Sequence, residues 1–214
     1  MFRPPIRYAI TDRSHYGSIE SARETGLLLQ AERLARAGID FIQLREKDLT
    51  PRELLRLARR MLDTLRREES QARLLINSGP NSRADIAVAA GAHGVHLTSG
   101  QGSGQDQLTP AQVRQVLRVD EPAISVSCHS LADVRRARDH AADLILFGPV
   151  FGKSIDGTLV VPGTGLDLLA EACTIAGTIP VLALGGITRE NIPSCLDTGA
   201  KGIAAIRLFQ ELAE

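Results

Sequence analysis

At 214 residues and 23.0 kDa, the chain is long enough for one sizeable domain. Its 25 basic and 25 acidic residues balance, so no global field draws it to nucleic acid or to an anionic membrane. An aromatic content of 3% excludes the stacking platforms of single-strand binders. Three scattered cysteines form no disulfide framework, and no segment is typical of a signal peptide or a membrane span. We therefore expect a cytoplasmic protein without nucleic-acid or membrane partners.

Short apolar runs alternate with helix-length amphipathic segments along the chain. The predicted strand and helix pairs are 8–11 and 19–37, 41–44 and 51–67, 74–76 and 82–90, 94–97 and 110–117, 123–126 and 131–140, 144–147 and 166–176, 181–184 and 189–196, and 202–206 and 208–213. Eight such units in a chain of this length favour a TIM barrel over an open doubly wound sheet. No linker divides them, so we predict an α/β protein with one barrel domain over residues 1–214.

Local signals mark where several helices begin and end. Thr50, Thr109 and Ser130 each stand directly before a predicted helix, where a side-chain oxygen can cap free backbone amides. The glycines expected to close helices in the left-handed conformation are Gly38, Gly91 and Gly199.

The segment 41–47 reads as a buried strand that ends in charged residues. Because strand side chains alternate, Gln43, Arg45 and Lys47 share one face. Two cations and an amide at the end of a buried strand favour an anionic partner, such as a phosphate or pyrophosphate. The alternative is a solvated strand end with a local Arg–Glu ion pair.

Polar residues recur where the predicted strands end, and in a barrel these ends converge. His129 can pass a proton near neutral pH, and Ser127 lies on its face of the strand, whereas His96 is flanked by apolar residues and reads as structural. Glycine turns and a helix start are typical of phosphate sites after the last two strands. The polar and glycine residues at strand ends are Asn77, Ser127, His129, Gly185, Gly186 and Arg207.

A glycine- and serine-rich stretch, 99–105, follows the fourth predicted strand. It lies on the face where barrel enzymes carry out their chemistry, so it is either a mobile lid or a flexible insertion.

Over nearly its whole length, the sequence resembles the thiamine phosphate synthase/TenI superfamily. The matching pieces are YAITD (8–12), FIQLREKD (41–48), LLIN (74–77), ADIAVAAGAHGVHL (84–97), SVSCHS (125–130), LFGPVF (146–151), LGGI (184–187) and TGAKGIAAI (198–206). The resemblance implies a TIM barrel that acts on small phosphate esters, and it implies a homodimer.

The resemblance also implies roles for individual residues. By this resemblance, Gln43, Arg45 and Lys47 hold the pyrophosphate of an aminopyrimidine substrate, and Asn77 and Ser127 make further contacts to it. The residues that match the cradle for thiazole phosphate are Gly185, Gly186, Ile206 and Arg207, although the family usually has Ser where this chain has Arg207.

The chain departs from the synthase pattern at its metal site. Synthases carry a magnesium-binding Asp where this chain has Ser78, and only Asp106 could supply the second carboxylate, after a shift of several residues. The synthase motif Thr-x-Thr-Lys after strand six is also replaced, since 153–156 read Lys-Ser-Ile-Asp, and its Lys is lost. Mg²⁺ neutralises the leaving pyrophosphate, and a neutral serine cannot replace the carboxylate that binds this ion.

TenI-type proteins share the barrel but lack the metal carboxylate, and characterised members are thiazole tautomerases. The resemblance therefore predicts a cofactor-free tautomerase in which His129 moves the proton that aromatises carboxythiazole phosphate. The first alternative is thiamine phosphate synthase, which would use Mg²⁺ and both thiazole phosphate and aminopyrimidine pyrophosphate. The second is a non-catalytic protein that binds thiazole or thiamine phosphate.

Overall fold

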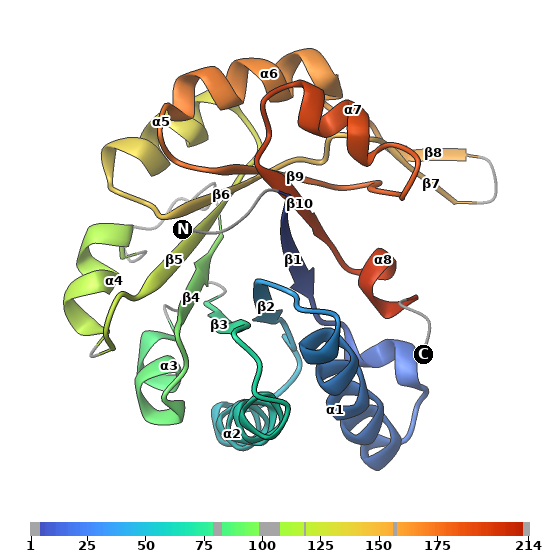
Figure 1. The fold of residues 1–214 in the computed structure, drawn as a ribbon, viewed down its shortest axis with the longest axis vertical. Helices are drawn as coiled ribbons and strands as arrows, with labels where there is room; N and C mark the ends of the chain where they lie inside the picture. The colour runs from blue at the N-terminus through green and yellow to red at the C-terminus, as the bar shows by residue number, and fades with distance from the viewer. Residues whose placement is uncertain (1–4, 79–82, 99–107, 118, 156–157, 212–214) are drawn as a thin grey trace.

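The computed structural model describes residues 5–78, 83–98, 108–117, 119–155 and 158–211, and for 153–155 and 158–161 it describes the backbone alone. Within these residues, eight parallel strands close into a barrel surrounded by helices (Figure 1). The barrel strands are β1 (Ile6–Ile10), β2 (Phe41–Leu44), β3 (Arg73–Asn77), β4 (Gly94–Leu97), β5 (Ala123–Cys128), β6 (Leu144–Phe147), β9 (Val181–Leu184) and β10 (Gly202–Ala205). Neighbouring strands follow the order β1-β10-β9-β6-β5-β4-β3-β2, and pairing of β1 with β10 and with β2 closes the ring. The predicted TIM barrel is confirmed.

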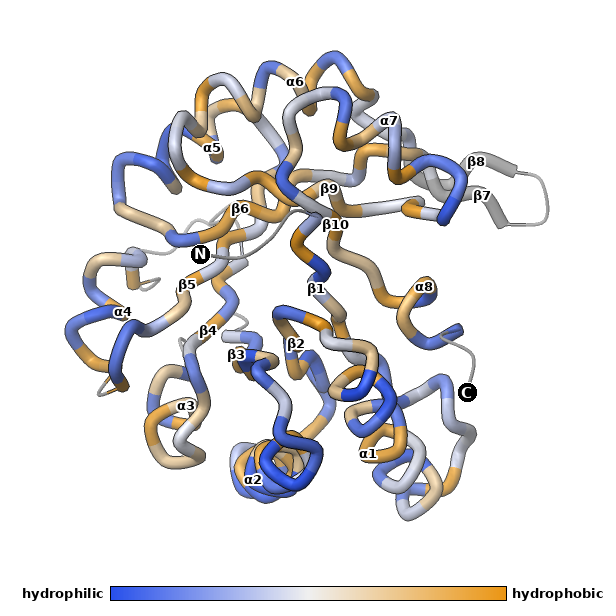
Figure 2. The backbone as a smooth tube through the Cα atoms, viewed as in Figure 1, coloured by the Kyte–Doolittle hydropathy of each residue, from blue (hydrophilic) through white to orange (hydrophobic). Residues whose placement is uncertain are grey.

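Helices connect the strands on the outside of the barrel. They are α1 (Glu20–Arg36), α2 (Pro51–Arg67), α3 (Ala84–Ala90), α4 (Pro110–Val116), α5 (Leu131–Asp139), α6 (Gly165–Ala176), α7 (Ile192–Asp197) and α8 (Arg207–Gln210). Apolar colours run along much of the strands, and hydrophilic colours are frequent on the outer helices and the loops (Figure 2). In the described part of the chain, no helix combines the length and the apolar character needed to cross a bilayer.

The helix signals in the sequence are confirmed. Thr50 and Thr109 accept from the amides of Glu53 and Gln112 in full capping boxes, and Ser130 accepts from the amide of Asp133. The glycines predicted to be left-handed, Gly38, Gly91 and Gly199, have φ values of 65°, 73° and 97°. Capping of this kind fixes where a helix begins and therefore where the preceding loop ends.

Two apolar layers stabilise the barrel. The larger lies between the strands and the helices, and the smaller fills the barrel interior, where the rings of Tyr8 and Phe41 stack with centroids 5.8 Å apart. Polar side chains are unevenly distributed around the interior. The half on β2 to β5 carries the polar side chains of Gln43, Asn77, His96, Ser125 and Ser127 beside the apolar Phe41, Leu75 and Ala123. The half on β6, β9 and β10 carries Leu144, Leu146, Leu182, Leu184, Ala204 and Ile206.

At the amino ends of β2, β4 and β6, a repeated contact ties each strand to the one before it. In each case, the residue just before the strand accepts a hydrogen bond from a backbone amide of the neighbouring strand. The contacts run from Arg7 N to Asp40 Oδ2 (2.8 Å), from Leu74 N to His93 Nδ1 (3.0 Å) and from Ile124 N to Asp143 Oδ2 (2.8 Å). The same contact between a side chain and a backbone amide therefore recurs every two strand–helix units.

Three features differ from the predicted elements. A short hairpin of β7 (Lys153–Ile155) and β8 (Thr158–Val161) follows β6 and projects away from the barrel (Figure 1). A 3-10 helix, η1 (Arg13–Tyr16), follows β1. The helix expected from residue 189 begins at Ile192, because the side chain of Asn191 accepts from Thr188 N and donates to Gly186 O, both at 2.9 Å.

Candidate functional site

Gln43 and Asn77, at the ends of β2 and β3, lie together inside the barrel. Gln43 Nε2 donates to Asn77 Oδ1 at 2.7 Å, and the two residues are 1% and 8% exposed. Within the described residues, Gln43 Oε1 is buried without a hydrogen-bond partner. An unpaired buried carbonyl is costly, so this oxygen is suited to accept a hydrogen bond from a ligand.

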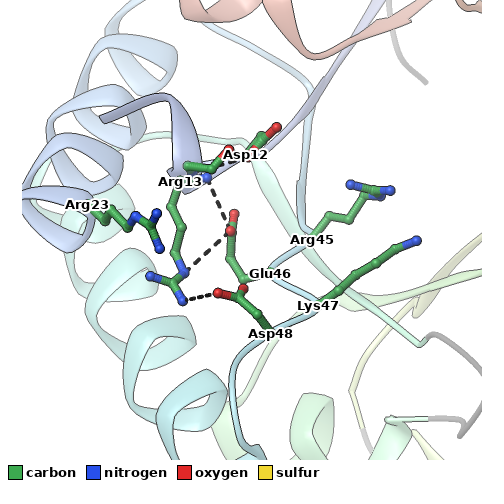
Figure 3. A pocket seen from close by; sticks show the side chains of 8 residues that line it. Asp12, Arg13, Arg23, Arg45, Glu46, Lys47 and Asp48 are labelled. Carbon is green, nitrogen blue, oxygen red and sulfur yellow. Dashed lines mark hydrogen bonds and ion pairs between the residues drawn. The ribbon is translucent and has the colours of Figure 1, made fainter. Parts of the chain in front are cut away.

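The loop after β2 sends its charged side chains in opposite directions. Arg45 and Lys47 extend to one side, while Glu46 and Asp48 point back toward Arg13 (Figure 3). The predicted alternation of this segment therefore continues beyond the end of the strand. A pocket of about 190 Å³ lies here, lined by Asp12, Arg13, Ser14, Arg23, Arg45, Glu46, Lys47 and Asp48.

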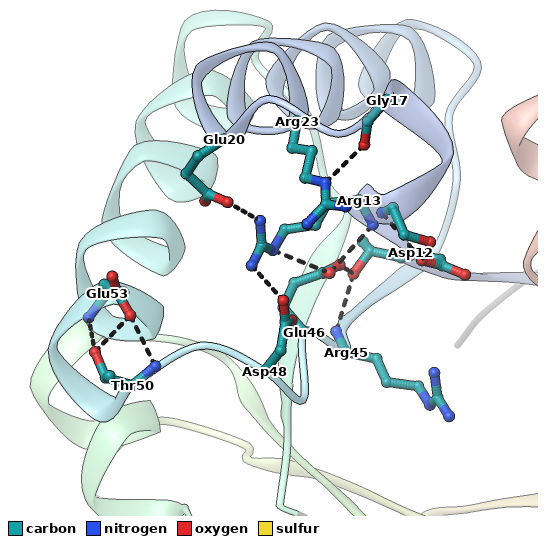
Figure 4. Close-up of polar contacts among 12 residues, drawn as sticks. Asp12, Arg13, Gly17, Glu20, Arg23, Arg45, Glu46, Asp48, Thr50 and Glu53 are labelled. Carbon is teal, nitrogen blue, oxygen red and sulfur yellow. Dashed lines mark hydrogen bonds and ion pairs between the residues drawn. The ribbon is translucent and has the colours of Figure 1, made fainter.

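An ion cluster around the buried Arg13 and Glu46 holds this loop on the side opposite to the cations, and we call it the Arg13 clamp (Arg13, Glu20, Glu46 and Asp48; Figure 4). Arg13 is 4% exposed, and its guanidinium pairs with Glu20, with Asp48 at 2.7 Å and with Glu46 at 3.6 Å. Glu46 also accepts hydrogen bonds from Thr11 Oγ1 and, at 3.1 Å, from Arg13 N. The local Arg–Glu pair foreseen as an alternative does not form in the described residues, because Glu46 pairs with Arg13 instead of Arg45. Arg45 is therefore available for a ligand.

Burial and ion pairing act on Glu46 in opposite directions. Burial raises the pKa of its carboxyl, and the hydrogen bonds from Thr11 and Arg13 together with the Arg13 charge offset part of that rise. Thr11 links the clamp to the strand end, because its hydroxyl oxygen accepts from Arg45 N at 2.9 Å. The backbone that carries Arg45 is therefore fixed from the side opposite to its guanidinium.

His129 lies just beyond β5 with an exposed side chain. Its Nδ1 donates to the carbonyl oxygen of Gly148 at 2.5 Å, and its backbone amide donates to Asp133 Oδ2 at 3.0 Å. A carbonyl oxygen can only accept, so Nδ1 carries the proton and a neutral His129 has its lone pair on Nε2. This arrangement suits a base that faces solvent or a ligand.

Ser127 and His96 are joined inside the barrel. Ser127 Oγ lies 2.8 Å from His96 Nε2, and Ser125 Oγ lies 2.8 Å from His96 Nδ1. Burial, with smaller effects from the charges of Arg45 and His129, lowers the pKa of His96 to about 3. His96 is therefore neutral at pH 7 and has partners on both ring nitrogens, which confirms its structural interpretation.

The glycine turn after β9 packs closely against the loop that contacts His129. Gly185 and Gly186 have φ values of 96° and 65°, which only glycine adopts without strain. Val150 N donates to Leu184 O at 2.8 Å and Phe151 N to Gly185 O at 3.1 Å. The candidate phosphate loop and the imidazole of His129 are therefore neighbours through the segment 148–151.

Ile206 and Arg207 lie at the end of β10. Ile206 precedes α8, and Arg207 is its first residue, with an exposed side chain. In the barrel, β1 separates β10 from β2, so the cations of the β2 loop and the β9–β10 loops flank the same strand. The two predicted anion-binding regions thus lie on either side of the Asp12 loop.

Ser78 occupies the position where the resemblance places a metal carboxylate. It is 2% exposed, and its Oγ donates to His96 O at 2.8 Å. Across the described residues, no three His, Cys, Asp or Glu side chains form a cluster that could hold a metal. Asp106 and the stretch 99–105 lie outside the described residues, so the structure addresses neither the shifted ligand nor the lid.

Sequence reasoning missed two groups in this region. The Arg13 clamp had a signal, because Arg13 follows directly on the matching piece YAITD and Glu46 alternates with the cations of the β2 loop. The contact between Tyr8 and Ser125 had none, since the two residues are 117 positions apart and meet only when the barrel closes.

Comparison with known proteins places the chain in a family. It matches the family described as thiamine monophosphate synthase over residues 7–209. It is 42% identical over 199 residues to a Geobacter sulfurreducens protein named "Putative thiamine-phosphate synthase", covering 93% of this chain and 84% of that protein. It is 35% identical to the thiamine-phosphate synthase of Koribacter versatilis, covering 94% and 87% of the two chains.

The fold comparison agrees with the sequence comparison. A solved thiamine phosphate pyrophosphorylase from Pyrococcus furiosus superposes with a TM-score of 0.71 at 26% identity, covering 94% of this chain and 85% of that one. Because the family match and these relatives span most of the sequence, the chain belongs to the thiamine monophosphate synthase family.

Proposed function

We propose that the chain is a thiamine-biosynthesis enzyme that acts as a thiazole phosphate tautomerase. In this reaction, a proton leaves one ring atom of carboxythiazole phosphate and another position is protonated, so the ring becomes aromatic without a redox partner. The observation that carries the proposal is the geometry of His129. Its Nδ1 is fixed on Gly148 O, which leaves Nε2 to take up and return the proton.

The neighbouring loops support this assignment. The turn at Gly185 and Gly186, together with Ile206 and Arg207, would hold the phosphate. Arg207 would add a charge-assisted hydrogen bond. Since the segment 148–151 joins this turn to His129, a phosphate ester bound there would bring its ring close to the imidazole.

The donor set at Ser78 supports a reaction without a metal. Its hydroxyl is used by a backbone carbonyl, and a serine offers no charge to a divalent cation. We therefore propose an enzyme without a cofactor, and we keep a cytoplasmic location and a homodimer as predictions.

Thiamine phosphate synthase is the second candidate, and a specific observation favours it. The Arg13 clamp holds Arg45 and Lys47 as a pair of available cations, as a pyrophosphate site requires. Gln43 and Asn77, joined by a hydrogen bond, and Ser127 would contact the aminopyrimidine. Such a synthase would need Mg²⁺ to neutralise the leaving pyrophosphate, with Asp106 as a ligand.

Substitution of His129 tests the tautomerase. His129→Gln should lower kcat on carboxythiazole phosphate by about 10² to 10⁴-fold, because the general acid and base is lost. Its affinity for thiazole phosphate, measured by calorimetry, should stay within about two-fold, since the phosphate loops are unchanged. The matched control is His140→Gln, on the exposed side chain at the end of α5, which should retain full activity.

Three outcomes would contradict the proposal. A fully active His129→Gln enzyme would remove the acid–base role. Robust formation of thiamine phosphate from both substrates with Mg²⁺, and none without it, would assign the synthase reaction instead. Thermal stabilisation by thiazole phosphate without turnover of either substrate set would indicate a binding protein.

A further inference from the structure

A chain of buried polar groups crosses the barrel interior from β1 to the carboxyl end of β5. The hydroxyl of Tyr8 lies 2.9 Å from Ser125 Oγ, which lies 2.8 Å from His96 Nδ1. On the other side of the ring, His96 Nε2 lies 2.8 Å from Ser127 Oγ. Tyr8 and Ser125 are 0% exposed and His96 is 3% exposed, whereas Ser127 is partly exposed. The chain therefore starts in the core and ends where a ligand can reach it.

The buried end determines which way the protons point. Tyr8 must place its hydroxyl proton on an acceptor, and its described partners are Ser125 Oγ and, at a longer 3.5 Å, His96 Nδ1. If Tyr8 donates to Ser125, the hydroxyl proton of Ser125 is free to fill the short contact with Nδ1. A neutral imidazole that accepts at Nδ1 carries its proton on Nε2. That proton then points at Ser127 Oγ.

Other proton arrangements leave a buried donor unpaired. If His96 carries its proton on Nδ1 and Ser125 donates to Tyr8, the hydroxyl proton of Tyr8 has no described acceptor. If both Nδ1 and Tyr8 donate to Ser125, the proton of Ser125 has none. A buried unpaired hydroxyl is expensive, whereas the arrangement that begins at Tyr8 pairs every proton in the buried part of the chain.

We propose that Tyr8, Ser125 and His96 act as positioning residues that hold the hydroxyl of Ser127 as a hydrogen-bond donor toward the bound ligand. Ser127 receives the Nε2 proton of His96, so its own proton points away from the ring. The ligand must then present an acceptor at this point, such as a ring nitrogen with a lone pair or a carboxylate oxygen. The identity of that ligand rests on the proposed function, but the direction of the chain does not.

The tautomer of His96 tests the direction of the hydrogen bonds from Tyr8 to Ser127 and needs no activity assay. The full chain is labelled with ¹⁵N-histidine, and two-dimensional NMR through the long-range couplings of each ring reports which nitrogen carries the proton at pH 7. The five histidines are assigned from His15→Gln, His93→Gln, His129→Gln and His140→Gln, so the buried site stays intact. A proton on Nε2 of His96 supports the proposal. A proton on Nδ1, or on both nitrogens, would overturn it.

Kinetics on carboxythiazole phosphate test the consequence for the ligand. Ser127→Ala should raise KM at least five-fold, and Ser127→Thr, which keeps a hydroxyl, should restore KM to within about two-fold. Ser125→Ala should raise KM in the same direction and leave kcat within about two-fold, because the chain orients the hydroxyl and does not move the reacting proton. An unchanged KM in Ser125→Ala, beside a raised KM in Ser127→Ala, would refute the positioning role. If no variant and no parent enzyme turns over this substrate, the proposed function fails while the NMR result still decides the direction of the chain.

Discussion

At the scale of single residues, the site is defined by side chains that are neutral where a charge would be expected. Ser78 presents a hydroxyl, which donates to a backbone carbonyl at 2.8 Å, at the position where the resemblance expects a carboxylate. His96 is an imidazole that cannot easily take up a proton, because it is 3% exposed and has a partner on each nitrogen. Arg45, Lys47 and Arg207 supply positive charge on the loops that follow β2 and β10.

The buried imidazole of His96 makes stability depend on pH. Its folded-state pKa of about 3 lies below the unfolded value of 6.5, so the unfolded chain binds the proton first. The contribution of this group to the free energy of unfolding is fully present above pH 6.5 and is lost as the pH decreases toward 3. Between pH 7.5 and 5.5, we expect a loss of about 1.4 kcal/mol from this group, measured by urea denaturation.

Substitution of His96 isolates this effect. His96→Gln should reduce the difference in unfolding free energy between pH 7.5 and 5.5 by about that amount, whatever its effect on stability at pH 7.5. His93, whose pKa is lowered by burial and by nearby arginines, contributes a slope of the same sign that the substitution leaves in place. The control is His140→Gln. If the unfolding free energy of His96→Gln and of His140→Gln depended equally on pH, His96 would take up its proton in the folded protein as readily as in the unfolded chain.

At the scale of elements, the loop after β2 depends on η1, because the Arg13 clamp joins the two. The 3-10 helix begins with Asp12, whose Oδ1 accepts from Ser14 N at 3.1 Å and so caps the turn that places Arg13. Arg13 then holds Glu46 and Asp48 on the side opposite to Arg45 and Lys47 (Figure 3). The direction of the two cations is thus set by a neighbouring element as well as by their own strand.

Removal of Arg13 should therefore affect both stability and anion binding. Arg13→Met leaves the buried carboxylate of Glu46 without its ion pair, and we expect a loss of about 3 kcal/mol in urea denaturation. Pyrophosphate binding by calorimetry should weaken as well, because the loop that carries Arg45 loses its support. The exposed Arg52 of α2 provides the control, and Arg52→Met should change stability by less than about 0.5 kcal/mol. Similar losses in both variants would show that the cluster is not a clamp.

Helices and strands could be predicted from the sequence where neighbouring residues determine their limits. The capped start of α2 at Thr50 and the apolar run of β2 are local, and both were predicted with the correct limits. The hairpin 153–161 was missed because β7 has only three residues, of which Lys153 and Ser154 are polar, so it shows no apolar run. The start of α7 was misplaced because its limit depends on the side chain of Asn191 and not on apolar spacing.

At the scale of the whole molecule, closure of the barrel brings together residues that the chain separates widely. The candidate residues at the strand ends could be predicted, since every parallel strand of a barrel points its carboxyl end at the same face. The contacts among them could not, because the distance from Tyr8 to Ser125 depends on how the strands pack around the ring. Sequence analysis therefore identified candidate residues, but it missed the network that orients Ser127.

The pairing of β1 with β10, which we call the seam, closes the barrel and leaves no room for a side chain at Gly202. A Cβ added to Gly202 would lie 2.0 Å from the carbonyl oxygen of Ile6, and neither backbone can move without opening the ladder. Gly202→Ala should therefore cost about 3 kcal/mol or more in urea denaturation. Gly91→Ala is the control: no atom lies within 4 Å of its added Cβ, so only the left-handed backbone is strained, by about 1–2 kcal/mol. A smaller loss at Gly202 than at Gly91 would show that the seam is loose.

The uneven distribution of polar side chains around the barrel has a consequence for how a flat molecule can lie over its carboxyl end. Hydrogen-bonding groups of Gln43, Asn77 and Ser127 lie toward that end on β2, β3 and β5, and the apolar Leu184 and Ile206 lie there on β9 and after β10. A heterocycle with heteroatoms along one edge and methyl or ring carbons along the other can form hydrogen bonds on the polar side and apolar contacts on the other in one orientation. In the opposite orientation, its heteroatoms would lie against apolar side chains and its carbons against polar ones. Such a barrel would select one face of a ring for chemistry before any catalytic group acts on it.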